Sequence, residues 1–230
     1  MRLDKYLADC GVGSRKEVKK IISDGRVTVG EAVVTDVGMQ VSEDVGVSVD
    51  GALVTYKKYS YVMMNKPAGV LTATQDYRDK TVLDLIKPPI PRELSPVGRL
   101  DKDTVGLLLL TNDGKLAHRL LSPKSHIPKT YYVQVTGDRV PDDSDVDAFK
   151  NGLELSDHTC LPAELSIVSD TELRITIYEG KFHQVKRMCA ARGFKVTYLR
   201  RESMGSLKLD PALAEGDYRD LTASELSHFL

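Results

Sequence analysis

The sequence predicts an α/β chain made of a small N-terminal unit and a larger α/β domain, and three observations support this. The 230 residues, 41% apolar and 28% charged, can bury a sizeable core, which excludes disordered and fibrous classes. Helix-periodic segments followed by short strand patterns fill the first 58 residues. Further along, apolar runs of strand length alternate with turn residues and helix-start signals.

Two helices are predicted before residue 26. Apolar residues from Leu3 to Cys10 follow helical spacing until Gly11 stops the helix. The capping box Ser14-Arg15-Lys16-Glu17 opens a second helix, which ends at Gly25. The lysines of this second helix lie opposite its apolar stripe, and such a face suits a phosphate backbone.

Short strands complete the small unit. They are predicted at 26–29 and 32–34, across the Gly30-Glu31 turn, and at 45–49 before the Asp50-Gly51 turn. Residues 56–60 have no strong pattern and are interpreted as the linker.

The larger domain contains three predicted strands. The first, 61–65, stops at Lys66-Pro67-Ala68-Gly69 because Pro and Gly interrupt it. The run 107–110 is too short for a typical helix and is interpreted as a buried strand. The third strand, 173–178, is followed by a loop and then by a predicted helix. A separate helix is predicted to begin in the acidic stretch 141–147, because acidic residues are favoured at a helix N-terminus. The loop before 107–110 is rich in polar residues. Loops held in place by a rigid strand often contain catalytic residues, so this loop is a candidate for the active site.

The formal charge of −1 hides unequal segments. Residues 59–135 hold 11 basic and 7 acidic groups (+4), and residues 173–205 hold 8 and 2 (+6). Residues 136–172 hold 2 basic and 10 acidic groups (−8) and offset them. The basic segments can therefore form a face for a polyanion while the acidic stretch points elsewhere.

Cysteine and hydropathy patterns set the expected compartment. Cys10, Cys160 and Cys189 are odd in number, widely spaced and without a CxxC pair, so neither a disulfide framework nor a zinc site is predicted. No apolar signal core opens the chain, and the longest apolar run, Leu107 to Leu110, is far too short to cross a bilayer. We expect a soluble cytoplasmic protein.

The first 58 residues resemble the S4 RNA-binding domain. The resemblance rests on Arg2-Leu3-Asp4-Lys5-Tyr6-Leu7, Gly13-Ser14-Arg15 and Asp24-Gly25-Arg26-Val27-Thr28-Val29, while Gly30-Glu31 departs from the usual Asn-Gly. It implies that residues 1–58 bind structured RNA. The implied RNA contacts are Arg2, Arg15, Lys19 and Arg26.

Four motifs follow this module in a fixed order: NKPAG, GRLDKDTVGLLLLTNDG, KTYYV and EGKFHQVKRM. Together with the later RRESMGSLKLD and EGDYRDLT, they resemble pseudouridine synthases of the small-subunit ribosomal RNA type from about residue 1 to residue 222. Val105 departs mildly from the Ser or Thr common there. The resemblance implies a catalytic domain at 59–230 with a mixed, largely antiparallel sheet flanked by helices, and no cofactor or metal.

The family isomerises uridine to pseudouridine in RNA, and the resemblance implies a role for each matched residue. Asp101 is the essential aspartate, Lys186 is its cationic partner, and Tyr131 stacks on the base and is the candidate base for the C5 proton. Arg99 fills the space left by the flipped nucleotide. The implied partner is 16S ribosomal RNA, at uridine 516, or the assembling small subunit, acted on by a monomer.

Other functions stay open at this point. Close relatives modify 23S ribosomal RNA of the large subunit, and a catalytically silent S4-type assembly factor would also bind RNA. A hydrolytic nucleosidase using Asp101 would usually need a second carboxylate across the scissile bond, and Asp103 lies too near in sequence for that span.

Overall fold

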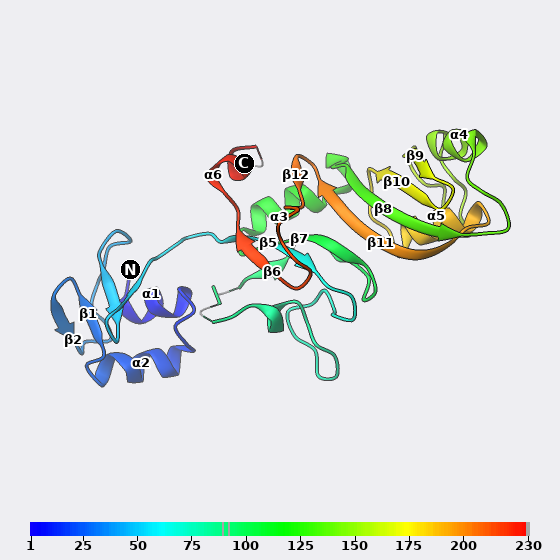
Figure 1. Ribbon diagram of the computed structural model, residues 1–230. Helices are drawn as coiled ribbons and strands as arrows, with labels where there is room; N and C mark the ends of the chain where they lie inside the picture. The colour runs from blue at the N-terminus through cyan, green and yellow to red at the C-terminus, as the bar shows by residue number, and fades with distance from the viewer. Residues whose placement is uncertain (89, 92, 229–230) are drawn as a thin grey trace. The chain divides into compact units, whose positions relative to one another are not determined.

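The computed structural model describes residues 1–88, 90–91 and 93–228 (Figure 1). The chain divides into two compact units. One consists of Met1–Ser60 with Ile86–Ser95, and the other of Tyr61–Leu85 with Pro96–Leu230. Each unit has its own apolar core.

The small unit packs two helices against a four-stranded antiparallel sheet of order β2-β1-β3-β4. Ser14 and Glu17 form the predicted capping box, and α1 and α2 bury Leu3, Leu7 and Ile22. The fourth strand was not predicted, because its three residues are half-buried or exposed and show no apolar alternation. The elements are α1 (Leu3–Asp9), α2 (Arg15–Ser23), β1 (Val27–Val29), β2 (Ala32–Val34), β3 (Val47–Val49) and β4 (Ala52–Val54).

The large unit is organised by one long sheet with the strand order β13-β5-β7-β11-β8-β10-β9. Neighbours along this order are antiparallel except β7 and β11, which confirms the mixed, largely antiparallel sheet. The strands are β5 (Tyr61–Lys66), β6 (Ser95–Pro96), β7 (Val105–Thr111), β8 (Lys129–Thr136), β9 (Glu164–Ser169), β10 (Glu172–Ile177), β11 (Lys195–Met204), β12 (Leu207–Lys208) and β13 (Tyr218–Asp220).

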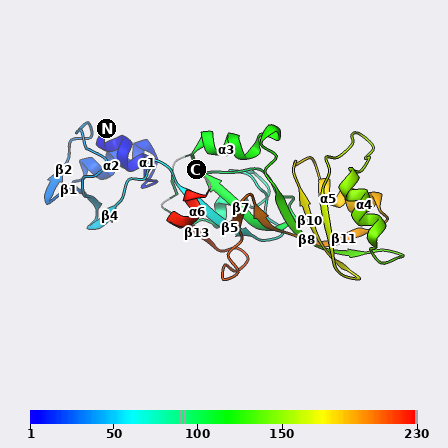
Figure 2. The ribbon, with the colours of Figure 1, turned by 90° about the horizontal axis from the view of Figure 1, so that it is seen from above.

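Helices cover the two ends of this sheet. In both ribbon views α3 lies beside β5 and β7, whereas α4 and α5 lie beside β8 and β10 (Figures 1 and 2). Leu116 and Leu120 of α3 pack on Leu107 and Leu109 in one core, and a second core joins α4 and α5 to β8 and β10. The helices are α3 (Gly114–Leu121), α4 (Asp143–Asn151), α5 (Gln184–Ala191) and α6 (Ala223–Ser227), with short 3₁₀ turns η1 (Leu83–Leu85) and η2 (Pro123–Ser125).

A short parallel pairing between β7 and β11, called the seam below, joins the two halves of the sheet. Only Val105 with Arg200 and Gly106 with Arg201 pair across β7 and β11. Gly106 has φ +100°, and a Cβ there would lie 2.4 Å from the Arg201 carbonyl oxygen. Glycine therefore lets the start of β7 approach the middle of β11.

The acidic stretch begins α4 as predicted, with Asp142 as N-cap, but it is not simply solvated charge. Asp145 is fully buried, and Arg139 and Arg192 donate to its carboxylate at 2.6 and 2.7 Å. Burial alone would raise the pKa of Asp145, but these hydrogen bonds lower it to about 2. Arg139 is already counted in the −8 of this segment, so Arg192, from outside it, offsets part of that charge.

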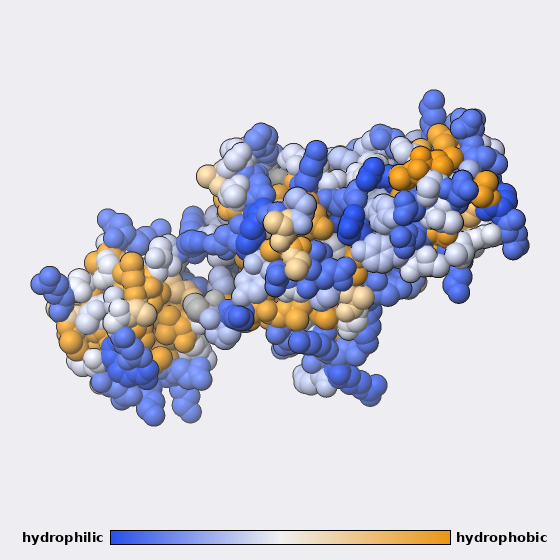
Figure 3. All heavy atoms as spheres, in the orientation of Figure 1, coloured by the Kyte–Doolittle hydropathy of each residue, from blue (hydrophilic) through white to orange (hydrophobic). Residues whose placement is uncertain are grey.

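The surface is mainly polar, with exposed apolar side chains on both units (Figure 3). They include Val33 and Leu53 in the small unit and Val168 on β9. Within the described part of the chain, no helix has the length and apolarity needed to cross a membrane.

Candidate active site

A pocket of about 240 Å³ opens beside the seam of the large sheet. Its walls come from the loop before β7, from β8, from the loop between β10 and α5, and from β11. The apolar residues Leu100, Ile177, Val185 and Leu199 line it together with charged groups. Its lining also includes the predicted site residues Arg99, Asp101 and Tyr131.

Asp101 contacts two cationic or potentially cationic side chains: His183, which also lines the pocket, and Lys186, which is not among its lining residues. Lys186 Nζ lies 3.1 Å from Asp101 Oδ2, and His183 Nε2 lies 3.5 Å from Oδ1. Burial alone would lower the pKa of Lys186, but its hydrogen bonds to Asp103 and Asp101 raise it above the ordinary value. Lys186 is therefore an ammonium at neutral pH, and it places a positive charge beside the Asp101 carboxylate.

Asp103 shares Lys186 with Asp101 but faces solvent. Its carboxylate accepts from Lys186 Nζ at 2.6 Å, and this hydrogen bond lowers the pKa of Asp103. The side chain of Asp103 is 74% exposed, against 27% for Asp101. Of the two carboxylates on this lysine, Asp101 is therefore the one that lines the pocket.

Tyr131 and Tyr132 point to opposite faces of β8, because side chains alternate along a strand. Tyr131 is buried and lines the pocket. The hydroxyl of Tyr132 donates to Glu172, and its ring lies under the guanidinium of Arg200. Only the first tyrosine of this pair can touch a molecule bound in the pocket.

Lys66 is a site residue that sequence reasoning missed. It is fully buried, and its ammonium donates to the carbonyls of Pro67, Asp101, Lys102 and Thr104 at 2.9–3.3 Å. Burial lowers the pKa of Lys66 to about 8, although the charges of the nearby carboxylates oppose this. The lysine thus ties the loop that carries Asp101 to the end of β5. Its only sequence signal was its place between a strand and a Pro-Ala-Gly turn.

Two cations, Lys129 and Arg201, line the pocket from strands, where lysines and arginines usually point to water. Arg201 is 2% exposed and donates to the carbonyl of Leu107 at 2.8 Å. Burial is the larger cause that lowers the pKa of Lys129, and the positive charge of Arg201 lowers it further. Both side chains line the pocket and give it a positive inner wall.

The predicted RNA contacts of the small unit have two kinds of surroundings. Arg15 and Lys19 are exposed on α2. Arg2 donates to Asp4 at 3.0 Å, and Arg26 is paired with Asp50. A phosphate that binds Arg2 or Arg26 would share that arginine with an aspartate. The exposed basic face of the small unit is formed by Arg15 and Lys19 of α2.

Comparison with known families identifies this arrangement. The family model described as RNA pseudouridylate synthase matches residues 60–191, a span that contains Asp101, Tyr131 and Lys186. The chain belongs to the RNA pseudouridylate synthase family. A second model, the S4 domain, matches residues 1–47. Both family resemblances seen in the sequence are thereby confirmed, and the chain is a pseudouridine synthase with an S4 domain.

Individual relatives cover nearly the whole chain. An RNA pseudouridine synthase of Bacillus subtilis is 49% identical over 233 residues, covering 98% of this chain and 97% of its own length. The ribosomal small subunit pseudouridine synthase A of Vibrio cholerae is 42% identical, covering 99% and 98%. A crystal structure of a pseudouridylate synthase superposes with a TM-score of 0.70 at 36% identity and covers all of both chains. The family fold thus extends over both units.

Proposed function

We propose that this pseudouridine synthase acts in the cytoplasm, as a monomer, on uridine 516 of 16S ribosomal RNA, with Asp101 as its catalytic carboxylate. One observation carries the assignment of the site: Asp101 lines a pocket together with Tyr131, and its carboxylate is paired with Lys186. The choice of small-subunit RNA is supported by relatives from Vibrio cholerae and Escherichia coli, which are named ribosomal small subunit pseudouridine synthase A.

The reaction breaks the N1–C1′ bond, turns the uracil and joins C5 to C1′. C5 loses a proton and N1 gains one, so atoms and electrons balance without an oxidant. A carboxylate at Asp101 can attack C1′, stabilise positive charge there or take a proton from C2′. Lys186 pairs with that carboxylate and holds it in position. Tyr131 stacks on the turned base and takes the C5 proton.

The target base must leave its stack before it reaches the pocket, at a cost of a few kcal/mol. Arg99 is exposed and lines the pocket, so its side chain can occupy the vacated position in the RNA. Lys129 and Arg201 add positive charge to the inner wall of the pocket, which favours an anionic nucleotide there.

The choice of RNA is tested by incubating the purified protein with 16S RNA, 23S RNA and assembling small-subunit particles. Pseudouridines are then mapped at nucleotide resolution. We expect one new pseudouridine, in small-subunit RNA or its particle. Product in 23S RNA alone would contradict the small-subunit target but keep the reaction. Free uracil would instead indicate a nucleosidase, and the absence of product from every RNA would indicate a silent binding factor.

The small unit is expected to bind RNA through its exposed basic face. Replacing Arg15 and Lys19 together by Gln removes two phosphate contacts, so the slope of log affinity against log salt should fall by roughly 1.5. Lys150→Gln, which removes an exposed lysine from the acidic α4, is the matched control and should leave the slope unchanged. An unaltered slope in the Arg15 and Lys19 variant would refute an RNA role for this face.

A further inference from the structure

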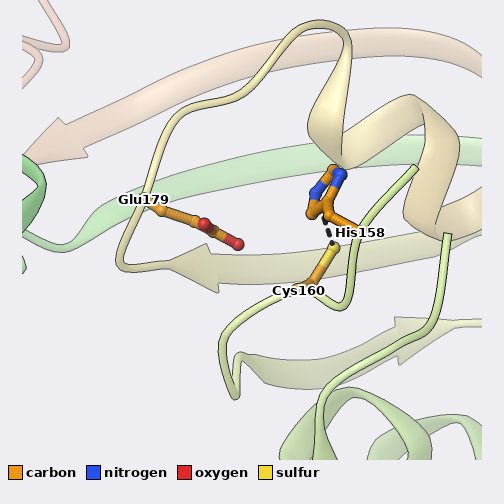
Figure 4. A group of neighbouring side chains, drawn as sticks. All are labelled: His158, Cys160 and Glu179. Carbon is orange, nitrogen blue, oxygen red and sulfur yellow. Dashed lines mark hydrogen bonds between the residues drawn. The ribbon is translucent and has the colours of Figure 1, made fainter.

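A second group of chemically reactive side chains lies in the large unit (Figure 4), and one of its members, Glu179, also lines the pocket. His158 and Cys160 come from the loop between α4 and β9, and Glu179 follows β10. One ligand atom from each lies within 4.8 Å of the other two. Cys160 Sγ and His158 Nε2 are 3.7 Å apart. Two such atoms on one tetrahedral zinc ion, at 2.3 and 2.0–2.1 Å, would be about 3.6 Å apart.

The loop that carries two of these donors is held by its backbone. Leu155 N–H donates to the His158 carbonyl and Cys160 N–H donates to the Leu153 carbonyl, both at 2.8 Å. Gly152, with φ +85°, lets the chain pass close to Cys160, since a Cβ would lie 2.7 Å from the Cys160 carbonyl oxygen. The imidazole and the thiol are therefore placed together before any ligand binds.

The histidine also has the outer partner that metal-bound histidines usually have. His158 Nδ1 lies 2.9 Å from Asp157 Oδ1, and Asp157 is in turn bound by Arg187. A proton held on Nδ1 by this carboxylate leaves the Nε2 lone pair directed at the Cys160 sulfur. Carboxylate–histidine pairs of this kind orient the ring and increase its basicity as a metal ligand.

We infer that His158, Cys160 and Glu179 form a binding site for a zinc-type divalent transition-metal ion, with water as the fourth ligand. The thiolate and the carboxylate neutralise the two positive charges. Binding breaks the S–H bond, forms a sulfur–metal bond and releases one proton to the solvent. Glu179 Oε1 accepts from Leu161 N–H and from Gln184 Nε2, which leaves Oε2 as the oxygen to bind the ion. Lys181, 3.6 Å from Oε2 and exposed, would turn toward solvent on metal binding.

The ion would join the loop between α4 and β9 to the segment after β10, which lines the pocket. His158 and Cys160 would be cross-linked to Glu179, which leads directly into the loop carrying His183 and into α5 with Lys186. Occupancy would therefore stiffen the loop that supplies the partners of Asp101. The metal site itself does not depend on the reaction proposed above, because no step of that reaction uses the ion.

The test titrates the full-length protein, stripped of metal, with Co²⁺ as a spectroscopic probe. We expect one equivalent to bind with a thiolate-to-cobalt charge-transfer band in the near ultraviolet, and Zn²⁺ to displace it. Cys160→Ser should lose this band. Cys189→Ser, which alters another buried thiol of the same unit, should keep it. Asp157→Asn should keep the band but weaken cobalt binding by about 10–100-fold.

Several results would overturn the inference. They are the absence of a thiolate band in the unmodified protein, a band that survives Cys160→Ser, and a band lost equally in Cys189→Ser. Circular dichroism checks that each variant is folded. If Cys160→Ser does not fold, His158→Asn takes its place, and it should also lose tight cobalt binding. Zn²⁺ should raise the melting temperature of the unmodified protein but not that of His158→Asn.

Discussion

Asp101→Asn is expected to lower the rate of pseudouridine formation by more than about a thousandfold while leaving RNA affinity unchanged. The amide has nearly the shape of the carboxylate but can neither attack C1′ nor stabilise positive charge there. Single-turnover assays with excess protein measure the chemical step, and filter binding measures affinity. The pocket should keep its shape in this variant. Loss of product together with unchanged RNA affinity would therefore show that the substitution affects the chemical step and not RNA binding.

Asp103→Asn is the matched control for this experiment. Asp103 shares Lys186 with Asp101 but is 74% exposed, so its replacement should change the single-turnover rate less than about tenfold. Equal losses in both variants would mean that the charge on Lys186, and not Asp101 itself, controls the reaction. Product formation by Asp101→Asn at the unmodified rate would end the assignment of Asp101.

Lys66→Met is expected to have the second-largest effect, although Lys66 does not line the pocket. The change leaves one buried and three partly buried carbonyls without their shared donor, which should lower the free energy of unfolding by about 2–4 kcal/mol. Loss of these bonds frees the loop around Asp101. The single-turnover rate should fall about 10–100-fold with unchanged RNA affinity, measured well below the melting temperature.

Lys102→Met serves as the control, since Lys102 lies in the same loop but only pairs with Asp79 at the surface. It should change stability by less than about 0.5 kcal/mol.

The lowered pKa of Lys66 predicts that stability depends on pH. Its pKa is about 8 folded and 10.5 ordinarily, so between these values the unfolded chain holds a proton that the folded chain has lost. The contribution of Lys66 to the free energy of unfolding therefore rises with pH across this window, and Lys66→Met should lack that rise. A wild-type rate and pH profile in Lys66→Met would contradict the positioning role.

Local patterns in the sequence predicted the elements that frame the site. The periodicity of Leu3 to Cys10, the capping box at Ser14 and the apolar run at 107–110 each specify their structure through contacts a few residues apart. The parallel pairing of β7 with β11 could not be predicted this way. It joins residues 105–106 to residues 200–201, and β11 has no apolar run to mark it as a central strand.

The missed residues have a common physical cause. Lys66, Arg201 and Asp145 are charged, and charged side chains are normally exposed, so their burial depends on partners contributed by distant segments. Lys66 needs the carbonyls of residues 101–104, and Asp145 needs Arg192. The same holds for the proposed metal ligands. Cysteine spacing indicated no zinc site, because Glu179 is brought to His158 and Cys160 only by the fold.

The narrow seam between β7 and β11 has a consequence for the width of the pocket. Gly106, Arg201 and Tyr131 are register partners across three adjacent strands, and the Asp101 loop runs directly into β7. The strand bearing Tyr131 is therefore two interstrand spacings, about 9–10 Å, from the strand that follows Asp101. Main-chain hydrogen bonds fix this separation. Repacking of side chains in either core can change what lines the pocket, but not the spacing of these strands.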